Sequence, residues 1–139
     1  MKRMFPLRAI ALLVVVFGVV VLAPASGRLP GASIARADTN TTLIVHYHRF
    51  ANDYGPMDTS SGWNLWLWPY QPAAGNGVAY PFDGKDAFGE VSHDTIPGAN
   101  TQVGLIVRLG DWQAKDISND RHVDTPNQHA EIWLIQGDP

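Results

Sequence analysis

The sequence predicts an all-β protein, and more closely an antiparallel β-sandwich. After residue 37, six or seven short runs of β-branched and aromatic residues follow one another along the chain. Clusters of Gly, Pro, Asn and Asp separate these runs at regular spacing, which is typical of sandwiches. None of the runs has a convincing helical period. The length of 139 residues suits one such domain preceded by a leader.

Each expected strand follows from local composition and ends at turn residues. The expected strands are residues 41–50, 63–68, 78–82, 90–96, 102–109, 121–124 and 130–136. The first alternates cleanly, with Leu43, Val45 and Tyr47 on one face. The fifth has Val103 and Leu105 on one face, with Gly104 on the other. Such alternation indicates strands that cover a core with one face.

Residues 1–37 are predicted to be a secretory signal peptide, and residues 38–139 a secreted, extracellular domain. Lys2, Arg3 and Arg8 form a basic start, and the apolar run 9–23 is shorter than an ordinary transmembrane helix. The tripeptide 35–37 (Ala-Arg-Ala) is the favoured cleavage signal because strand-like sequence begins just after it. Cleavage after residues 23–25 (Ala-Pro-Ala), or an uncleaved anchor, is the alternative.

Removal of the leader makes the domain acidic. Five of the ten basic residues lie in residues 1–37, so five remain against thirteen acidic residues, a formal net charge of −8. This charge disfavours nucleic acid and anionic membranes as partners, and favours a neutral ligand. The chain has no cysteine, which excludes thiol catalysis and cysteine-bound zinc.

The stretch 63–68 (Trp-Asn-Leu-Trp-Leu-Trp) is the strongest candidate for a binding surface. As a strand, it places Trp63 on the core face with the two leucines. Trp66 and Trp68 then share the other face, about 6.6 Å apart at a rise of about 3.3 Å per residue. One interpretation is that both indoles stack on sugar rings. The alternative is that the strand is buried on both faces and the indoles belong to a core.

A second candidate segment is the polar stretch 110–127, which contains Trp112. A tryptophan among charged loop residues indicates binding, because loops on a rigid scaffold carry binding groups. The alternative is an anchor tucked into the sandwich edge. Lys115, Asp116 and Asp120 follow closely. A carboxylate beside an ammonium matches two neighbouring sugar hydroxyls, although any one of these charges alone is more often a solvated loop residue.

Metal and catalytic sites are not predicted, and neither is a cofactor. The aspartates of residues 111–124 lack the spacing of a calcium loop. His46 and His48 form a pair on one strand face, but no third ligand is nearby in sequence. Motifs for nucleophilic, zinc, phosphate or dinucleotide chemistry are absent from the sequence. Trp133 alternates with Ile132 and Leu134 and is expected to be structural.

Six motifs together resemble a known family. They are 46–49 (His-Tyr-His-Arg), 62–68 (Gly-Trp-Asn-Leu-Trp-Leu-Trp), 103–108 (Val-Gly-Leu-Ile-Val-Arg), 111–116 (Asp-Trp-Gln-Ala-Lys-Asp), 120–121 (Asp-Arg) and 131–138 (Glu-Ile-Trp-Leu-Ile-Gln-Gly-Asp). In this order they resemble the pullulanase-associated module, family 41 of the carbohydrate-binding modules. The resemblance covers residues 41–138. The long insertion between Arg49 and Gly62 departs from the family's pattern at one end of the site.

The resemblance implies an immunoglobulin-like β-sandwich that binds α-glucans: pullulan, amylopectin, glycogen and maltooligosaccharides. It implies that Trp66, Trp68 and Trp112 form an aromatic platform. It also implies that Lys115 and Asp120 bind sugar hydroxyls, with Asp116 a weaker third. Modules of this family normally precede a glycoside hydrolase domain of the pullulanase type.

Three hypotheses result for the function of the chain. The first is a non-catalytic α-glucan-binding module with no catalytic residues of its own. The second is the N-terminal targeting fragment of a secreted pullulanase-type glycoside hydrolase whose catalytic domain is not in this chain. The third and weaker one is a β-sandwich adhesion or scaffold module that binds protein.

Overall fold

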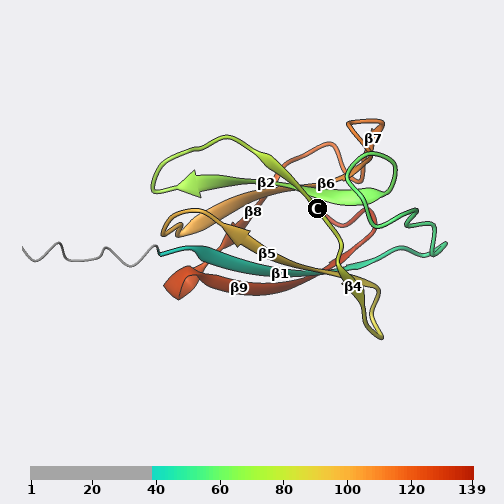
Figure 1. Cartoon of the computed structure of the whole chain (residues 1–139), viewed down its shortest axis with the longest axis horizontal. Helices are drawn as coiled ribbons and strands as arrows, with labels where there is room; N and C mark the ends of the chain where they lie inside the picture. Colours follow the sequence, from blue (N-terminus) through green and yellow to red (C-terminus); the bar gives the residue numbers. More distant parts are fainter. Residues whose placement is uncertain (1–38) are drawn as a thin grey trace, which may run out of the picture. The chain divides into compact units, whose positions relative to one another are not determined.

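A computed structural model describes residues 39–139, which form two β-sheets packed face to face (Figure 1). The four-stranded sheet has the order β4-β5-β1-β9. The five-stranded sheet has the order β3-β2-β6-β7, and β8 also pairs with β6. The prediction of an all-β sandwich is confirmed. The predicted signal peptide, residues 1–37, lies outside the described residues.

The strands agree closely with those expected from the sequence. They are β1 (Thr41–His48), β2 (Trp63–Gln71), β3 (Val78–Pro81), β4 (Gly84–Lys85), β5 (Glu90–Ile96), β6 (Gln102–Leu109), β7 (Ala114–Lys115), β8 (Arg121–Asp124) and β9 (His129–Ile135). The two-residue strands β4 and β7 were not predicted, because two residues are too few to show a period. β2 continues past Pro69, where its register with β6 shifts.

One helical turn lies among residues 39–139, the three-residue 3₁₀ turn Pro126–Gln128 that joins β8 to β9. No helix in this part of the chain is long and apolar enough to cross a bilayer.

One strand pair departs from the antiparallel pattern. β1 pairs with β5 antiparallel but with β9 in parallel, with His46 opposite Trp133. Parallel neighbours need a long connection, and here all the other strands lie between β1 and β9 in the chain. β9 thereby becomes the edge strand of the four-stranded sheet.

The core lies between the sheets and consists of the inward faces that alternation predicts. Its buried hydrophobic members are Leu43, Val45, Tyr47, Tyr54, Trp63, Leu65, Leu67, Phe82, Ile96, Val103, Leu105 and Val107. Trp63 is 8% exposed, which confirms its assignment to the core. Since β2 and β6 give every second side chain to this core, the alternate side chains must point outward from the five-stranded sheet.

Candidate functional site

The outward face of the five-stranded sheet holds both tryptophans of the W-x-W stretch. Trp66 lies opposite Ile106 and Trp68 opposite Gly104, and directly opposed residues point to the same face. Both indoles are half-buried. The alternative of a fully buried, two-sided strand is therefore wrong for residues 66 and 68.

Two glycines let these indoles lie against the sheet. A Cβ at Gly104 would come within 2.0 Å of the Trp68 ring, and a Cβ at Gly77 within 2.1 Å of the Trp66 ring. Real Cβ atoms essentially never approach so closely. A glycine inside a strand often marks such a close approach. Both rings thus rest on backbone and have little freedom to move.

Arg108 connects Trp66 to Trp112. Its guanidinium carbon lies 4.6 Å from the centre of the Trp66 ring and 4.5 Å from that of the Trp112 ring. The two indoles are in edge contact, with centres 5.4 Å apart and planes at 61°. An arginine between two aromatic rings, shielded from water, contributes on the order of 2 kcal/mol per cation–π contact. Arg108 is 2% exposed, so this contact is well shielded.

Hydrogen bonds hold the guanidinium in place. Arg108 Nε donates to Asn64 Oδ1 at 3.0 Å, and its Nη1 donates to Asp111 Oδ1 at 3.3 Å. The Asn64 amide in turn donates to the carbonyls of Gly62 and Gly110, both at 3.1 Å. Arg108 and Asn64 were not predicted as site residues. In the sequence, only their positions on the outward faces of β6 and β2 could have indicated them. Arg108 and Asn64 are brought together only by the pairing of β2 with β6.

Trp112 lies in the turn between β6 and β7. Gln113 N–H donates to the Leu109 carbonyl at 3.0 Å, and Gly110 has a φ of +48°. Trp112 itself has a φ of +69°, which is rare and strained for a bulky residue. Its side chain is 46% exposed. The turn therefore holds a large aromatic side chain in solvent at a cost in backbone energy, as binding sites often do.

The insertion between Arg49 and Gly62 supports this turn. Gly110 N–H donates to the Gly62 carbonyl at 2.9 Å. Within the insertion, the Asp58 carboxylate accepts hydrogen bonds from the backbone N–H groups of Ser60 and Ser61. These bonds lower the pKa of Asp58 to about 2. A Cβ on Gly110 would come within 2.6 Å of the Ser60 carbonyl, so the insertion packs against the turn that carries Trp112.

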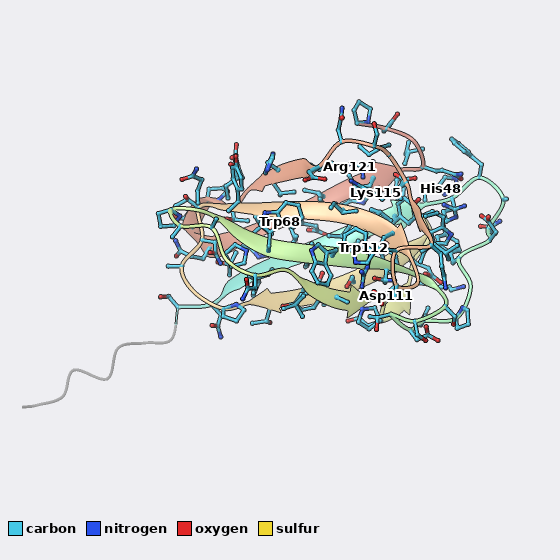
Figure 2. The ribbon with its side chains drawn as sticks, turned by 90° about the horizontal axis from the view of Figure 1, so that it is seen from above. His48, Trp68, Asp111, Trp112, Lys115 and Arg121 are labelled. Atoms are coloured by element: carbon cyan, nitrogen blue, oxygen red, sulfur yellow. The ribbon has the colours of Figure 1, made fainter. Side chains whose placement is uncertain are left out.

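Lys115 and Asp120 lie together beside the tryptophans. Lys115 is opposite Arg108 in the β6–β7 pair, so it points to the same outward face. Its Nζ donates to Asp120 Oδ1 at 3.0 Å and to the Ser118 carbonyl at 3.0 Å. Figure 2 looks down on this sheet and shows Trp68 and Trp112 over the strands, with Lys115 beside them. We call Trp66, Trp68, Trp112, Lys115 and Asp120 the platform.

Asp116, one residue further, points inward instead. Its carboxylate is 1% exposed and accepts hydrogen bonds from Tyr47 Oη at 2.8 Å and from Arg121 Nη2 at 2.9 Å. Burial and the bond to Asp116 raise the pKa of Tyr47. Asp116 is therefore a structural residue, and its predicted place as a third ligand contact is wrong.

Two aromatic residues that were not predicted as site residues lie next to the platform beyond Trp68. His122 of β8 lies opposite Gly104 of β6, and the His122 ring centre is 6.3 Å from that of Trp68. Tyr70 packs on His122 with ring centres 4.0 Å apart. Alternation along β2 could have indicated Tyr70, but Pro69 suggested that the strand had already ended.

The opposite outer face contradicts one expectation. Trp133 is 55% exposed, so its predicted structural role is wrong. Ala130, Ile132 and Leu134 are the residues of β9 that pack on the core, and Trp133 alternates away from them. His46 Nδ1 and Nε2 hydrogen-bond Asp86 at 2.6 Å and Glu131 at 2.9 Å, while His48 bonds the Phe88 carbonyl. In residues 39–139 no group of three or more side chains is arranged to hold a metal ion.

A family model and two solved structures are similar to this chain. Residues 41–139 match the family model described as the bacterial pullanase-associated domain. The chain is 21% identical to a structure titled as a product complex of SpuA, a multi-modular glycogen-degrading pneumococcal virulence factor, with a TM-score of 0.49. That match covers 70% of this chain and 10% of SpuA. The chain is 23% identical to CBMd, a family CBM41 module of Amy13K from Eubacterium rectale, with a TM-score of 0.47. That match covers 71% of this chain and 90% of CBMd.

A β-sandwich with an aromatic outer face is a common form of ligand-binding module. The match over residues 41–139 defines it further: the chain belongs to the family of bacterial pullulanase-associated domains. The family predicted from the sequence motifs is confirmed.

Proposed function

We propose that the chain is a non-catalytic module that binds α-glucans, namely pullulan, amylopectin, glycogen and maltooligosaccharides. The observation that carries the proposal is one outward sheet face with three tryptophans beside an ion-paired lysine and aspartate. The indoles stack on glucose rings, and Lys115 and Asp120 hydrogen-bond the hydroxyls. Membership of the pullulanase-associated family supports this choice of sugar.

The geometry of the platform suits a bent glucan. Trp66 and Trp112 have planes at 61°, so a chain that contacts both must change direction between them. α-Linked glucose chains curve in this way, whereas a flat, extended chain would leave one ring uncontacted. The Lys115–Asp120 pair presents donors and an acceptor at one side, which orients the sugar.

The carboxylates at the platform favour binding over hydrolysis. Glycoside hydrolysis uses two carboxyl groups, one of them protonated. Here Asp111 is engaged with Arg108 and Asp120 with Lys115. Both carboxylates are therefore paired with a cation and not with each other.

The proposal includes secretion of the module. Residues 1–37 are a signal peptide, residues 38–139 are the binding module, and the module acts outside the cell. The alternative function is the N-terminal targeting part of a secreted pullulanase-type glycoside hydrolase, in which the module raises the local concentration of the enzyme on its substrate. The family's association with pullulanase favours this second candidate.

Affinity electrophoresis in gels that contain pullulan tests the proposal. The wild-type protein should be retarded and Trp66→Ala should migrate nearly as in a gel without polysaccharide. Phe50→Ala is the matched control, since Phe50 is 71% exposed but lies outside the platform. Retardation of the control with loss in Trp66→Ala supports the platform. Unretarded wild-type protein contradicts the proposal.

A further inference from the structure

A groove runs along the open edge of the sandwich, between β8 and β9. These strands are the edges of different sheets and do not pair with each other. The groove has a volume of about 730 Å³. Its lining includes Val123, Ile132 and Leu134, which pack against the core from the groove's floor.

Trp133 forms one wall of this groove and is held rigidly. Its indole stacks on His46 of the neighbouring strand, with ring centres 4.7 Å apart and planes at 5°. His46 is 9% exposed and is fixed by its bonds to Asp86 and Glu131. Since β1 lies on one side of β9 and β9 is the edge strand, the second face of the indole is turned toward the groove.

The opposite wall carries polar groups of a kind that bind hydroxyls. Asn119 and Asp120, just before β8, and His122 and Asp124 of β8 line it, and these residue types offer both donors and acceptors. Arg121 also belongs to β8, but its guanidinium bonds the buried Asp116. The exposed charges of the wall are therefore negative, which disfavours an anionic ligand.

The groove is continuous with the platform. Asp120 accepts a hydrogen bond from Lys115 on the platform side and also lines the groove. His122 contacts Trp68 and Tyr70 on the outer face and lines the groove as well. The groove therefore has an indole on its β9 side and donors and acceptors on its β8 side, and the platform likewise combines indoles with Lys115 and Asp120.

We infer that the groove between β8 and β9 is a second α-glucan-binding site, in which one glucose ring of the chain stacks on the free face of Trp133 and neighbouring rings of the same chain reach the polar side chains on the β8 side. The inference rests on the proposed function, because it takes its ligand from the platform. Two sites on one module allow it to hold two segments of one polysaccharide, or two chains, and avidity on glycogen or pullulan rises accordingly.

Isothermal titration calorimetry with maltotetraose tests the second site. The wild-type protein should bind two molecules per chain. Trp133→Ala should bind one, with the affinity of the remaining site unchanged, and Trp66→Ala should bind one at the groove. Trp133→Phe keeps a smaller ring and should bind two molecules, one of them more weakly. Phe50→Ala, which removes an exposed ring elsewhere, should still bind two.

The inference is overturned if Trp133→Ala keeps the stoichiometry and affinities of the wild type. It is also overturned if the wild type binds one molecule and Trp133→Ala only weakens it, because platform and groove would then be a single site. In both cases the platform still binds and the proposed function stands. If the wild type binds no maltotetraose and is not retarded by pullulan, the proposed function and the second site both fail.

Discussion

The two sheets of the sandwich differ in how they support the indoles on their outward faces. Apart from the Arg121–Asp116 pair, the five-stranded sheet has an apolar inward face, and it holds Trp66 and Trp68 against its outward face, over Gly77 and Gly104. The four-stranded sheet puts carboxylates on its inward face and supports its exposed indole, Trp133, from the side with a histidine.

The difference shows two ways to hold a flat aromatic surface in water. A glycine beneath an indole uses the backbone as the support, which leaves a broad face open along the sheet. A stacked imidazole leaves only the far face of the indole free, at the sheet's edge. The first arrangement suits a platform for several sugar units, and the second suits a single ring.

The largest expected effect concerns the buried carboxylate of Asp94 in the four-stranded sheet. Burial raises the pKa of Asp94 to about 7, from an ordinary value of 3.8. The folded state keeps this proton between those values while the unfolded state loses it, so stability should fall as the pH rises from about 4 to 7 and then level off. A shift of this size corresponds to about 4 kcal/mol.

Asp94→Asn should therefore remove most of this pH dependence. The variant should gain stability relative to the wild type at pH 8 and differ little from it near pH 4. Ser92 Oγ donates to Asp94 Oδ1, and an asparagine oxygen keeps that bond. Urea unfolding curves at several pH values measure the effect. Asp124→Asn is the control, because Asp124 is exposed and bonds Gln102 instead of any group around Asp94. A flat wild-type profile would contradict the expectation.

The next effect concerns Arg108, the support that Trp66 and Trp112 share. Arg108→Gln removes two cation–π contacts. We expect affinity for maltotetraose to fall about 30-fold, or about 2 kcal/mol. Stability should fall by about 1–3 kcal/mol, because the buried Asn64 oxygen loses its donor.

Arg108→Lys separates charge from shape. It keeps the positive charge but lacks the planar fork that stacks between the rings. Its affinity should lie between those of the wild type and Arg108→Gln. If Arg108→Gln binds as tightly as the wild type, the two indoles do not depend on this residue.

The sequence predicted the elements whose signal is local. Alternation located β6 at its observed bounds and assigned Trp63 to the core, while local composition and turn residues located β5 and β8. The platform residues were candidates because three tryptophans and a lysine–aspartate pair are distinctive in composition. The structure brings all five of these residues to one region.

The features that were missed depend on which strands lie side by side. Spacing alone could not distinguish Asp116 from Asp120, but the backbone of Asp116 continues the β6–β7 ladder with its N–H on the Val107 carbonyl, which turns its side chain inward. Trp133 was wrongly predicted to be structural because Ile132 and Leu134 flank it, so the strand looks apolar on both faces. The role of Arg108 could not be predicted because its hydrogen-bond partner, Asn64, lies 44 positions away in the sequence.

A smaller effect should follow from filling the space beneath Trp68. Gly104→Ala places a methyl group where the indole lies, so the ring must lift from the sheet. We expect an affinity loss of about tenfold, or about 1.4 kcal/mol, with the second site on Trp133 unaffected. Calorimetry with maltotetraose measures the loss. Gly84→Ala is the control, because its new Cβ would meet nothing within 4 Å, and equal effects of the two changes would contradict a specific role for Gly104.

The smallest effect concerns the histidine that supports Trp133. Burial disfavours the charged imidazole, but the hydrogen bonds to Glu131 and Asp86 outweigh it and raise the pKa of His46 above its ordinary value of 6.5. Glu131→Gln removes one of the two carboxylates and should lower the pKa of His46. The stability that protonated His46 contributes, present at low pH and lost as the pH rises through its pKa, should then disappear at a lower pH.

Histidine NMR titration measures the shift in the pKa of His46. Asp124→Asn is the control and should leave this pKa unchanged, because the Asp124 carboxylate bonds Gln102 instead. An unchanged His46 in Glu131→Gln would mean that Asp86 alone holds the proton, and that the edge support of Trp133 does not need β9's own carboxylate.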